Sequence, residues 1–131
     1  MLAYLESSAV AKLVIEEAES PALRQAVSEM AARLTSVIAE IEARRALRRT
    51  KPTPERMDQL ETTFAGLEMV ELDATIRQRA GTLEPVSLRS LDAIHLAAAL
   101  SLGDELGAFV CYDTRLSAAA AAHGLPVLAP S

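Results

Sequence analysis

Four carboxylates occupy positions in the sequence where a charged side chain is unexpected. Glu6 and Asp113 directly follow two short apolar runs, LAYL and AFVCY, and Asp92 lies in SLDAIHLAAAL among residues that belong in a core. Glu42 follows Ser36 by six residues in a segment that is otherwise rich in alanine and isoleucine. A carboxylate buried without a partner is strongly destabilising, so these positions point to a shared role.

A cluster of carboxylates has a well-defined chemical requirement. Two like charges about 4 Å apart repel by roughly 4 kcal/mol at an effective dielectric constant near 20, so the cluster needs a cation to remain ionised. Oxygen ligands without His or Cys are those that Mg²⁺ or Mn²⁺ prefers. Such an ion activates a bound water and neutralises the charge that builds on a phosphodiester during in-line attack. The four acids therefore predict metal-dependent phosphodiester cleavage.

Two of the four acids also have purely structural interpretations. Asp113 is a favourable N-cap for the helix TRLSAAAAA, and Glu42 is spaced to pair with Arg45 or Arg49 on an exposed helix face. Glu6 has no basic neighbour in sequence, and the residues around Asp92 are apolar. The sequence leaves both interpretations open for Asp113 and Glu42.

Apolar runs of strand length alternate with helical patterns along the whole chain. The expected strands are residues 2–5, 34–35, 69–72, 108–112 and 125–130. The expected helices are residues 9–18, 22–34, 36–49, 55–67, 74–83, 87–103 and 114–123. This alternation predicts an α/β fold with a central parallel sheet of four or five short strands flanked by helices. Ligands of such sheets bind beyond the carboxyl ends of the strands, where Glu6 and Asp113 are expected.

The helix boundaries are predicted from local signals. Ser7 and Ser8 are candidates to cap the first helix, Ser20 with Pro21 opens the second, and Asp73 caps the helix that begins at Ala74. A chain of 131 residues with 50% hydrophobic content fits a single domain, so we expect one unit over residues 1–131.

The charge distribution is uneven. The net charge of −5 excludes a broadly basic surface, yet residues 44–56 contain 6 of the 13 basic side chains. These are Arg44, Arg45, Arg48, Arg49, Lys51 and Arg56. Such a run forms either a local basic patch or an ordinary solvated helix face. Only four aromatic residues are present, so a base-stacking platform is not expected.

The single cysteine, Cys111, excludes an internal disulfide and a thiolate zinc site. The first residues lack a basic stretch before the apolar one, and no apolar run reaches the length of a membrane span. These features predict a cytoplasmic protein that does not bind membranes. Cys111 and His95 are expected to be packing residues, although His95 follows Asp92 by three positions, as a metal pair on a helix could.

Several segments together resemble the PIN-domain ribonucleases, in particular the VapC toxins of bacterial toxin–antitoxin modules. YLESSAVAKL is similar to the opening strand and helix of that family, TSVIAEIEARRALRR to the segment with the second acid and LRSLDAIHLAAAL to that with the third. FVCYDTRLSAAAAAHGLPVLAP is similar to the segment with the fourth acid and the ending. The resemblance covers the whole chain.

The resemblance implies an endoribonuclease toxin that cleaves structured RNA such as tRNA or rRNA. It implies catalytic roles for Glu6, Glu42, Asp92 and Asp113, with Mg²⁺ or Mn²⁺ held by Glu6, Asp92 and Asp113. It also implies a homodimer and a cognate VapB-type antitoxin that blocks the site. We expect a helix of the antitoxin on an apolar groove of the first helices, with a basic side chain reaching the acids.

Arg44, Arg45 and Arg115 follow acids of the cluster closely in sequence. Because a guanidinium group binds phosphate with two parallel hydrogen bonds, these arginines are candidates to bind RNA phosphates beside the cut.

Glu6 departs from the family pattern, in which the first acid is nearly always Asp. The extra carbon–carbon bond displaces the carboxylate by roughly 1.5 Å, and a misplacement of about 1 Å can lower a rate on the order of a hundredfold. Three alternatives follow: a shifted metal geometry, a preference for Mn²⁺, or a weakened or inactive toxin. The last makes the chain a PIN-like protein-interaction module. A phosphate-accepting receiver domain also places Asp at strand ends, but it needs a lysine near a late strand, and the only lysines are Lys12 and Lys51.

Overall fold

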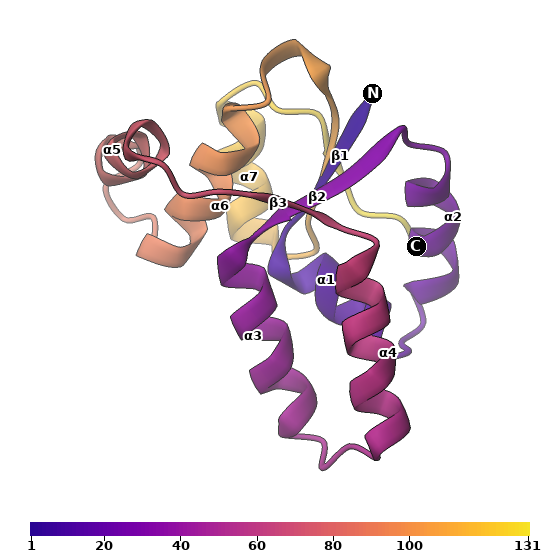
Figure 1. Ribbon diagram of the computed structural model, residues 1–131. Coiled ribbons are helices and arrows are strands. Elements are labelled where there is room, and N and C mark those ends of the chain that lie inside the picture. Colours follow the sequence, from indigo (N-terminus) through magenta and orange to yellow (C-terminus); the bar gives the residue numbers. More distant parts are fainter.

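The computed structural model describes residues 1–131 and is an α/β fold with a central sheet of five parallel strands in the order β3-β2-β1-β4-β5 (Figure 1). The strands are β1 (Leu2–Leu5), β2 (Ala32–Ser36), β3 (Glu68–Val70), β4 (Leu106–Val110) and β5 (Val127–Leu128). The helices are α1 (Ser7–Val14), α2 (Ser20–Ser28), α3 (Val37–Arg48), α4 (Pro54–Ala65), α5 (Ala74–Thr82), α6 (Ser90–Leu100) and α7 (Thr114–Ala122), with a 3₁₀ turn, η1, at Gly103–Glu105. The predicted fold class is confirmed.

The central strand β1 is buried on both faces because helices cover both sides of the sheet. Successive side chains of a strand point to opposite faces, and here Tyr4 and Leu5 enter two different hydrophobic clusters. Tyr4 lies opposite Leu34 of β2 and Phe109 of β4, and it stacks on the Phe109 ring with centroids 5.7 Å apart. The uninterrupted apolar run LAYL is therefore the pattern of a strand with no solvent-facing side.

The helices divide between the two faces. Residues of α1, α2, α3 and α4 form one cluster with the sheet, and residues of α6 and α7 form the other. In Figure 1, α5 lies outside α6 at one edge of the molecule, whereas α3 and α4 extend together away from the sheet and end at the turn that joins them. This extended pair carries most of the basic run described above.

Two helix predictions were wrong at their ends. The first helix ends at Val14 rather than at residue 18, because Ile15 is already extended and the Lys12 carbonyl accepts a hydrogen bond of 2.6 Å from the Ser20 hydroxyl instead. The second helix ends at Ser28 rather than at residue 34. Ala32 pairs with Leu2 in the sheet, so strand pairing overrides the helical propensity of the alanine-rich stretch.

Other boundaries shift by smaller amounts. The sixth helix starts at Ser90, three residues later than predicted, and β4 ends at Val110, so Cys111 and Tyr112 lie just past the strand. Asp73 caps α5 as predicted, by accepting a hydrogen bond from the Ile76 amide at 2.8 Å. No helix of the structure has the length and apolar character that crossing a membrane requires.

Candidate active site

The carboxyl ends of β1 and β4, which are neighbours in the sheet, place Glu6 and Asp113 at the same edge. The Glu6 amide donates a hydrogen bond of 3.0 Å to the Val110 carbonyl, so the backbone of Glu6 continues the pairing with β4. Asp113 follows β4 after the two residues Cys111 and Tyr112. This arrangement follows directly from the parallel pairing of the two strands.

Glu6 is only 6% exposed, and its side chain caps α1. Its Oε1 accepts hydrogen bonds from the Ser8 amide at 2.9 Å and from the Ser8 hydroxyl. The Ser8 oxygen in turn accepts a 2.9 Å hydrogen bond from the Tyr112 amide, so Ser8 joins the ends of β1 and β4. The sequence placed the cap on Ser7 or Ser8, which was wrong because the longer glutamate side chain folds back onto the first turn.

Asp113 and Asp92 form an acidic pair. Asp113 Oδ1 caps α7 through the amides of Arg115 at 2.9 Å and Leu116 at 3.1 Å, whereas Oδ2 makes no hydrogen bond. Asp92 lies in the first turn of α6 with its side chain 20% exposed. Burial, and secondly the charge of Asp113, raise the pKa of the Asp92 carboxyl. The capping role of Asp113 is therefore real, and it leaves Oδ2 without a hydrogen bond.

Glu42 reaches the same edge from α3. Its Oε1 accepts a hydrogen bond from the Ser7 hydroxyl and lies 3.3 Å from Nε2 of His95. The hydrogen bonds from His95 and then Ser7 lower the pKa of Glu42, although partial burial opposes them. No salt bridge joins Glu42 to Arg45 or Arg49, so the alternative of an exposed ion pair on one helix is wrong.

A chain of hydrogen bonds connects Glu42 to the core. Ser7 Oγ lies 2.8 Å from His95 Nε2, and His95 Nδ1 lies 2.7 Å from the Tyr4 hydroxyl. An ionised carboxylate only accepts hydrogen bonds, so Ser7 donates to Glu42 and accepts from Nε2–H of His95. Nδ1 then accepts from Tyr4, whose pKa burial raises above its usual value, which keeps the hydroxyl protonated. One neutral tautomer of His95 satisfies every group.

His95 therefore has no nitrogen free for a metal, and it is 1% exposed. This confirms the structural interpretation of His95 over that of a metal pair with Asp92. Cys111 is also buried, as expected; burial and the charge of Glu6 raise the pKa of its thiol to about 12.

The donor chemistry of this edge fits a hard divalent cation. No three His, Cys, Asp or Glu side chains are grouped closely enough to form a metal-ligand cluster. Mg²⁺, however, is usually bound through one or two carboxylates together with substrate phosphates. Asp92 and Asp113 supply two such carboxylates. Oδ2 of Asp113 makes no hydrogen bond, and Asp92 is partly desolvated by burial. The residues thus fit an ion that completes its shell with water and phosphate.

The three arginines predicted to bind RNA differ in their surroundings. Arg44 is held by Glu61 and by Glu40 at 3.2 Å, and these hydrogen bonds raise its pKa. Arg45 forms no salt bridge. Arg115 lines a hollow of about 250 Å³ together with Asp92 and Arg89. Arg44 is therefore neutralised, and the other two guanidinium groups are available.

Sequence reasoning missed Arg89 and the chain from Ser7 to Tyr4. Arg89 Nε lies 3.8 Å from Asp92 Oδ2, and its spacing of three residues from Asp92 was the available signal. For the hydrogen-bonded chain, the signals were the position of Ser7 beside Glu6 and that of His95 beside Asp92. Neither position in the sequence indicated that the side chains of Ser7 and His95 contact each other.

The comparisons with known proteins show the family and the fold of this chain. Residues 3–122 match the PIN domain family. The chain is 40% identical over 128 residues to Ribonuclease VapC46 of Mycobacterium tuberculosis (strain ATCC 25618 / H37Rv). The aligned region covers 98% of this chain and 97% of that protein.

Two solved structures share the fold. The crystal structure of VapBC2 from Rickettsia felis, bound to a DNA fragment from their promoter, matches with a TM-score of 0.79 and 12% identity over 100% of both chains. The crystal structure of Mycobacterium tuberculosis VapC20, titled a Sarcin-Ricin loop cleaving toxin, matches with a TM-score of 0.73 and 14% identity over 98% of this chain and 99% of that one. At such low identity these matches establish the fold alone.

Proposed function

Because this chain belongs to the PIN domain family and is a ribonuclease toxin of the VapC type, we propose that it is a Mg²⁺- or Mn²⁺-dependent endoribonuclease controlled by a VapB-type antitoxin. The observation that carries the proposal is the match of residues 3–122 to the PIN domain family, with Asp113 just beyond the end of β4. The acidic pair of Asp92 and Asp113 supports it, because burial and then the charge of Asp113 raise the pKa of Asp92. Such a pair is stabilised by a cation and not by water alone.

The ion would be held by Asp92 and Asp113; Glu6 follows β1, the strand paired with β4, but the three carboxylates are not grouped as a ligand cluster. When bound, it would supply an activated water and neutralise charge on the phosphodiester. The chain itself supplies orientation: Ser8 fixes the carboxylate of Glu6 against β4, and the α7 amides fix Asp113 so that Oδ2 remains free.

Glu42 is proposed to accept a proton or orient water at the opposite side of this edge. Ser7 and His95 hold its carboxylate ionised, as its lowered pKa indicates, and a 35% exposed side chain can still reach solvent and substrate.

Arg45 and Arg115 are proposed to bind phosphates that flank the cut. Arg89 joins them, because the hollow beside Asp92 is lined by both Arg89 and Arg115.

RNA cleavage with Mg²⁺ or Mn²⁺, compared between this chain and Asp92→Asn, tests the proposal. We expect loss of cleavage in Asp92→Asn, because one of the two acids that hold the ion is gone. Asp58→Asn is the matched control, since Asp58 is exposed on α4 and its carboxylate makes no hydrogen bond or salt bridge. Equal cleavage by the Asp92→Asn variant, or cleavage that a chelator leaves unchanged, would contradict it.

A second candidate function is a PIN-like interaction module without cleavage activity. The observation that favours it is Glu6, the longer acid at the end of β1, whose Oε1 is held by the Ser8 amide and hydroxyl as the cap of α1. Cleavage that appears only after Glu6→Asp, with antitoxin binding unchanged, would support this second function.

The proposed antitoxin surface is a hollow of about 300 Å³ between α1, α2 and α4. It is lined by three apolar side chains, Leu13, Val27 and Leu67, and by polar residues that include Arg24 and Arg33. An amphipathic helix with acidic flanks fits such a groove. Adding the antitoxin should abolish cleavage, and Leu13→Glu should prevent this inhibition while leaving cleavage intact. Inhibition of the Leu13→Glu variant equal to that of the parent would exclude the groove.

Homodimerisation and a cytoplasmic location are proposed from family membership. Sedimentation of the purified chain measures the oligomeric state, and a monomer at micromolar concentration would contradict the dimer.

A further inference from the structure

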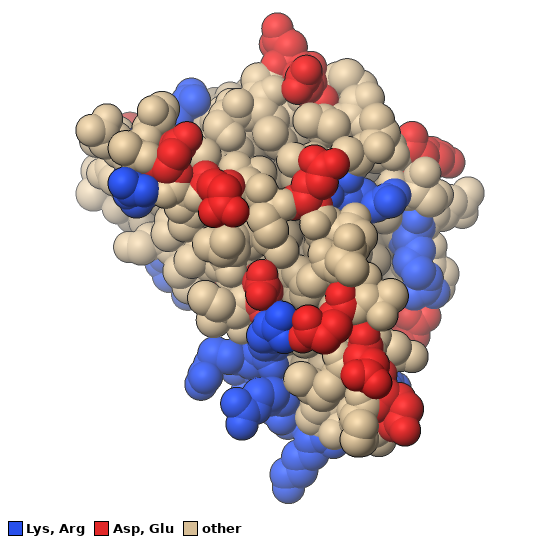
Figure 2. All heavy atoms as spheres, viewed as in Figure 1, with Lys and Arg blue, Asp and Glu red and all other residues tan.

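We propose that the tip of the α3–α4 pair binds the sugar-phosphate backbone of RNA at a distance from the cut; this inference rests on the proposed ribonuclease function and extends it. The surface, called the distal basic patch here, consists of Arg48, Arg49, Lys51 and Arg56. All four side chains are exposed. Figure 2 shows blue side chains gathered at the lower end of the molecule, where α3 and α4 end.

The patch gathers four cations without salt-bridge partners within residues 48–56 of the chain. None of its four side chains forms a salt bridge, whereas Lys12, Arg24, Arg44 and Arg89 each lie within 4.0 Å of a carboxylate oxygen. In a chain with a net charge of −5, four unneutralised cations at one end create a local positive field. Such a field attracts a polyanion.

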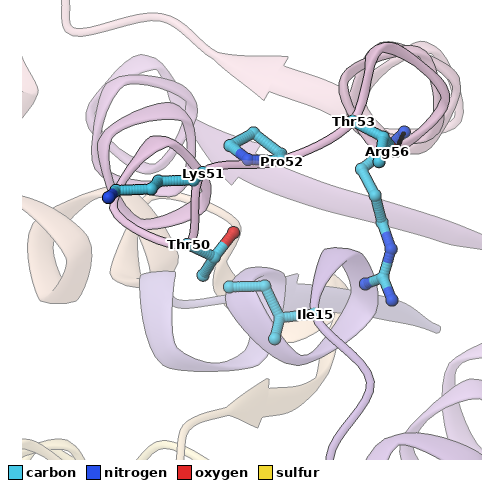
Figure 3. Close-up of a pocket in the computed structure, with 6 residues that line it drawn as sticks. All are labelled: Ile15, Thr50, Lys51, Pro52, Thr53 and Arg56. Atoms are coloured by element: carbon cyan, nitrogen blue, oxygen red, sulfur yellow. Dashed lines mark hydrogen bonds between the residues drawn. The ribbon is translucent and has the colours of Figure 1, made fainter.

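Two hollows shape this surface. One, of about 280 Å³, is lined only by Arg45, Arg48 and Arg49, and it joins the patch to the arginine proposed to act near the cut. The other, of about 240 Å³, lies at the α3–α4 turn; Figure 3 shows Lys51 and Arg56 on opposite sides of it, with Ile15 beneath. Lys51 has a positive φ of 52°, which turns the chain sharply between the two helices.

The composition of the hollows selects the kind of partner. Protein interfaces have an apolar or aromatic centre, but the first hollow contains no hydrophobic residue and the second contains only Ile15. Guanidinium groups bind phosphate with paired hydrogen bonds, and no base-stacking aromatic ring is present. The surface therefore fits a nucleic-acid backbone and reads no sequence.

The geometry places this contact outside the catalytic edge. Seven residues of helix separate Glu42 from Arg49, which is roughly 10 Å along the axis of α3. At about 3.4 Å per nucleotide along a strand, a dinucleotide at the acids would not reach the tip, whereas a folded RNA would. The patch is thus proposed to favour large structured substrates over short ones.

The test is RNA binding as a function of salt, in an Asp92→Asn background that prevents cleavage. Replacing Arg48 and Arg49 together with Ala should reduce the slope of log K against log salt by about 1.4 to 1.8, the value for two lost phosphate contacts, and lower the affinity at 0.1 M salt by roughly 25- to 60-fold. The matched control is Arg77→Ala with Arg79→Ala, which removes the same charge from the exposed helix α5. An unchanged slope, or an equal change in the control, would overturn the proposal.

Cleavage assays with variants that retain Asp92 distinguish a failure of this inference from a failure of the proposed ribonuclease function. With Arg48 and Arg49 replaced, cleavage of a structured RNA should fall while cleavage of a short oligonucleotide that reaches only the acids stays unchanged. Loss of both would overturn a distal role. If no RNA is cleaved by any variant but the salt slope still falls, the ribonuclease function fails while the patch stands. Normal RNA binding with lost antitoxin binding would make the tip a protein interface and overturn the proposal.

Discussion

Shortening the first acid by one methylene group gives the sharpest test of the site. In Glu6→Asp, the carboxylate retracts by about one carbon–carbon bond, roughly 1.5 Å. The present carboxylate is bound to the Ser8 amide at 2.9 Å and to the Ser8 hydroxyl, which direct it onto the first turn of α1. Aspartate is itself a favourable N-cap, so we expect the free energy of unfolding to change by less than about 1 kcal/mol.

The expected kinetic gain follows from the displacement. A misplacement of about 1 Å costs on the order of a hundredfold in rate, so Glu6→Asp should raise kcat/KM by roughly 10- to 100-fold, or about 1.4 to 2.7 kcal/mol in the activation barrier. The gain should be larger with Mg²⁺ than with Mn²⁺, because Mg²⁺ demands stricter octahedral geometry.

The assay is cleavage of a structured RNA under single-turnover conditions with each ion in turn. Glu42→Asp is the matched control: the same shortening withdraws the carboxylate from Ser7 and His95, so cleavage should fall. If Glu6→Asp is folded but no faster with either ion, the length of the first acid does not limit the reaction, and the reasoning from side-chain reach is refuted.

Three further predictions concern the same edge of the sheet. Burial and Asp113 raise the pKa of Asp92 in the folded protein, so its penalty is absent below the unfolded pKa, grows as the pH rises from that value to the raised folded pKa, and is complete above it. Asp92→Asn should therefore be more stable than the parent at neutral pH and equal to it in acid, as denaturation at several pH values measures. Mn²⁺ at about 100 times its Kd should stabilise the parent by about 2.7 kcal/mol and so raise its Tm, but it should not raise the Tm of Asp92→Asn. An equal rise of the Tm in both would exclude Asp92 as a ligand. Ser8→Ala should lower stability by about 1 to 3 kcal/mol, because Glu6 and the Tyr112 amide lose their shared partner; a loss below 0.5 kcal/mol, on the order of an exposed serine, would contradict this.

Local patterns along the chain were sufficient for the architecture. The apolar run LAYL identifies a strand buried on both faces. Asp73 predicts the start of α5, and its side chain caps that helix in the structure. Alternation of such runs predicts the parallel sheet, and the parallel sheet places Glu6 and Asp113 at one edge without further information. These features depend on neighbouring residues, whose preferences a sequence records directly.

Contacts between distant segments were decided by the tertiary structure. Ser7 meets Glu42 and His95, which are 35 and 88 residues away, because α1, α3 and α6 converge at the carboxyl edge. Arg44 is neutralised by Glu61 on another helix, whereas Arg48 and Arg49, on the same helical run, have no partner. Spacing identifies the face of a helix on which a side chain lies, but the packing of helices determines which charge stands opposite it, and with it which acids and arginines remain free to act.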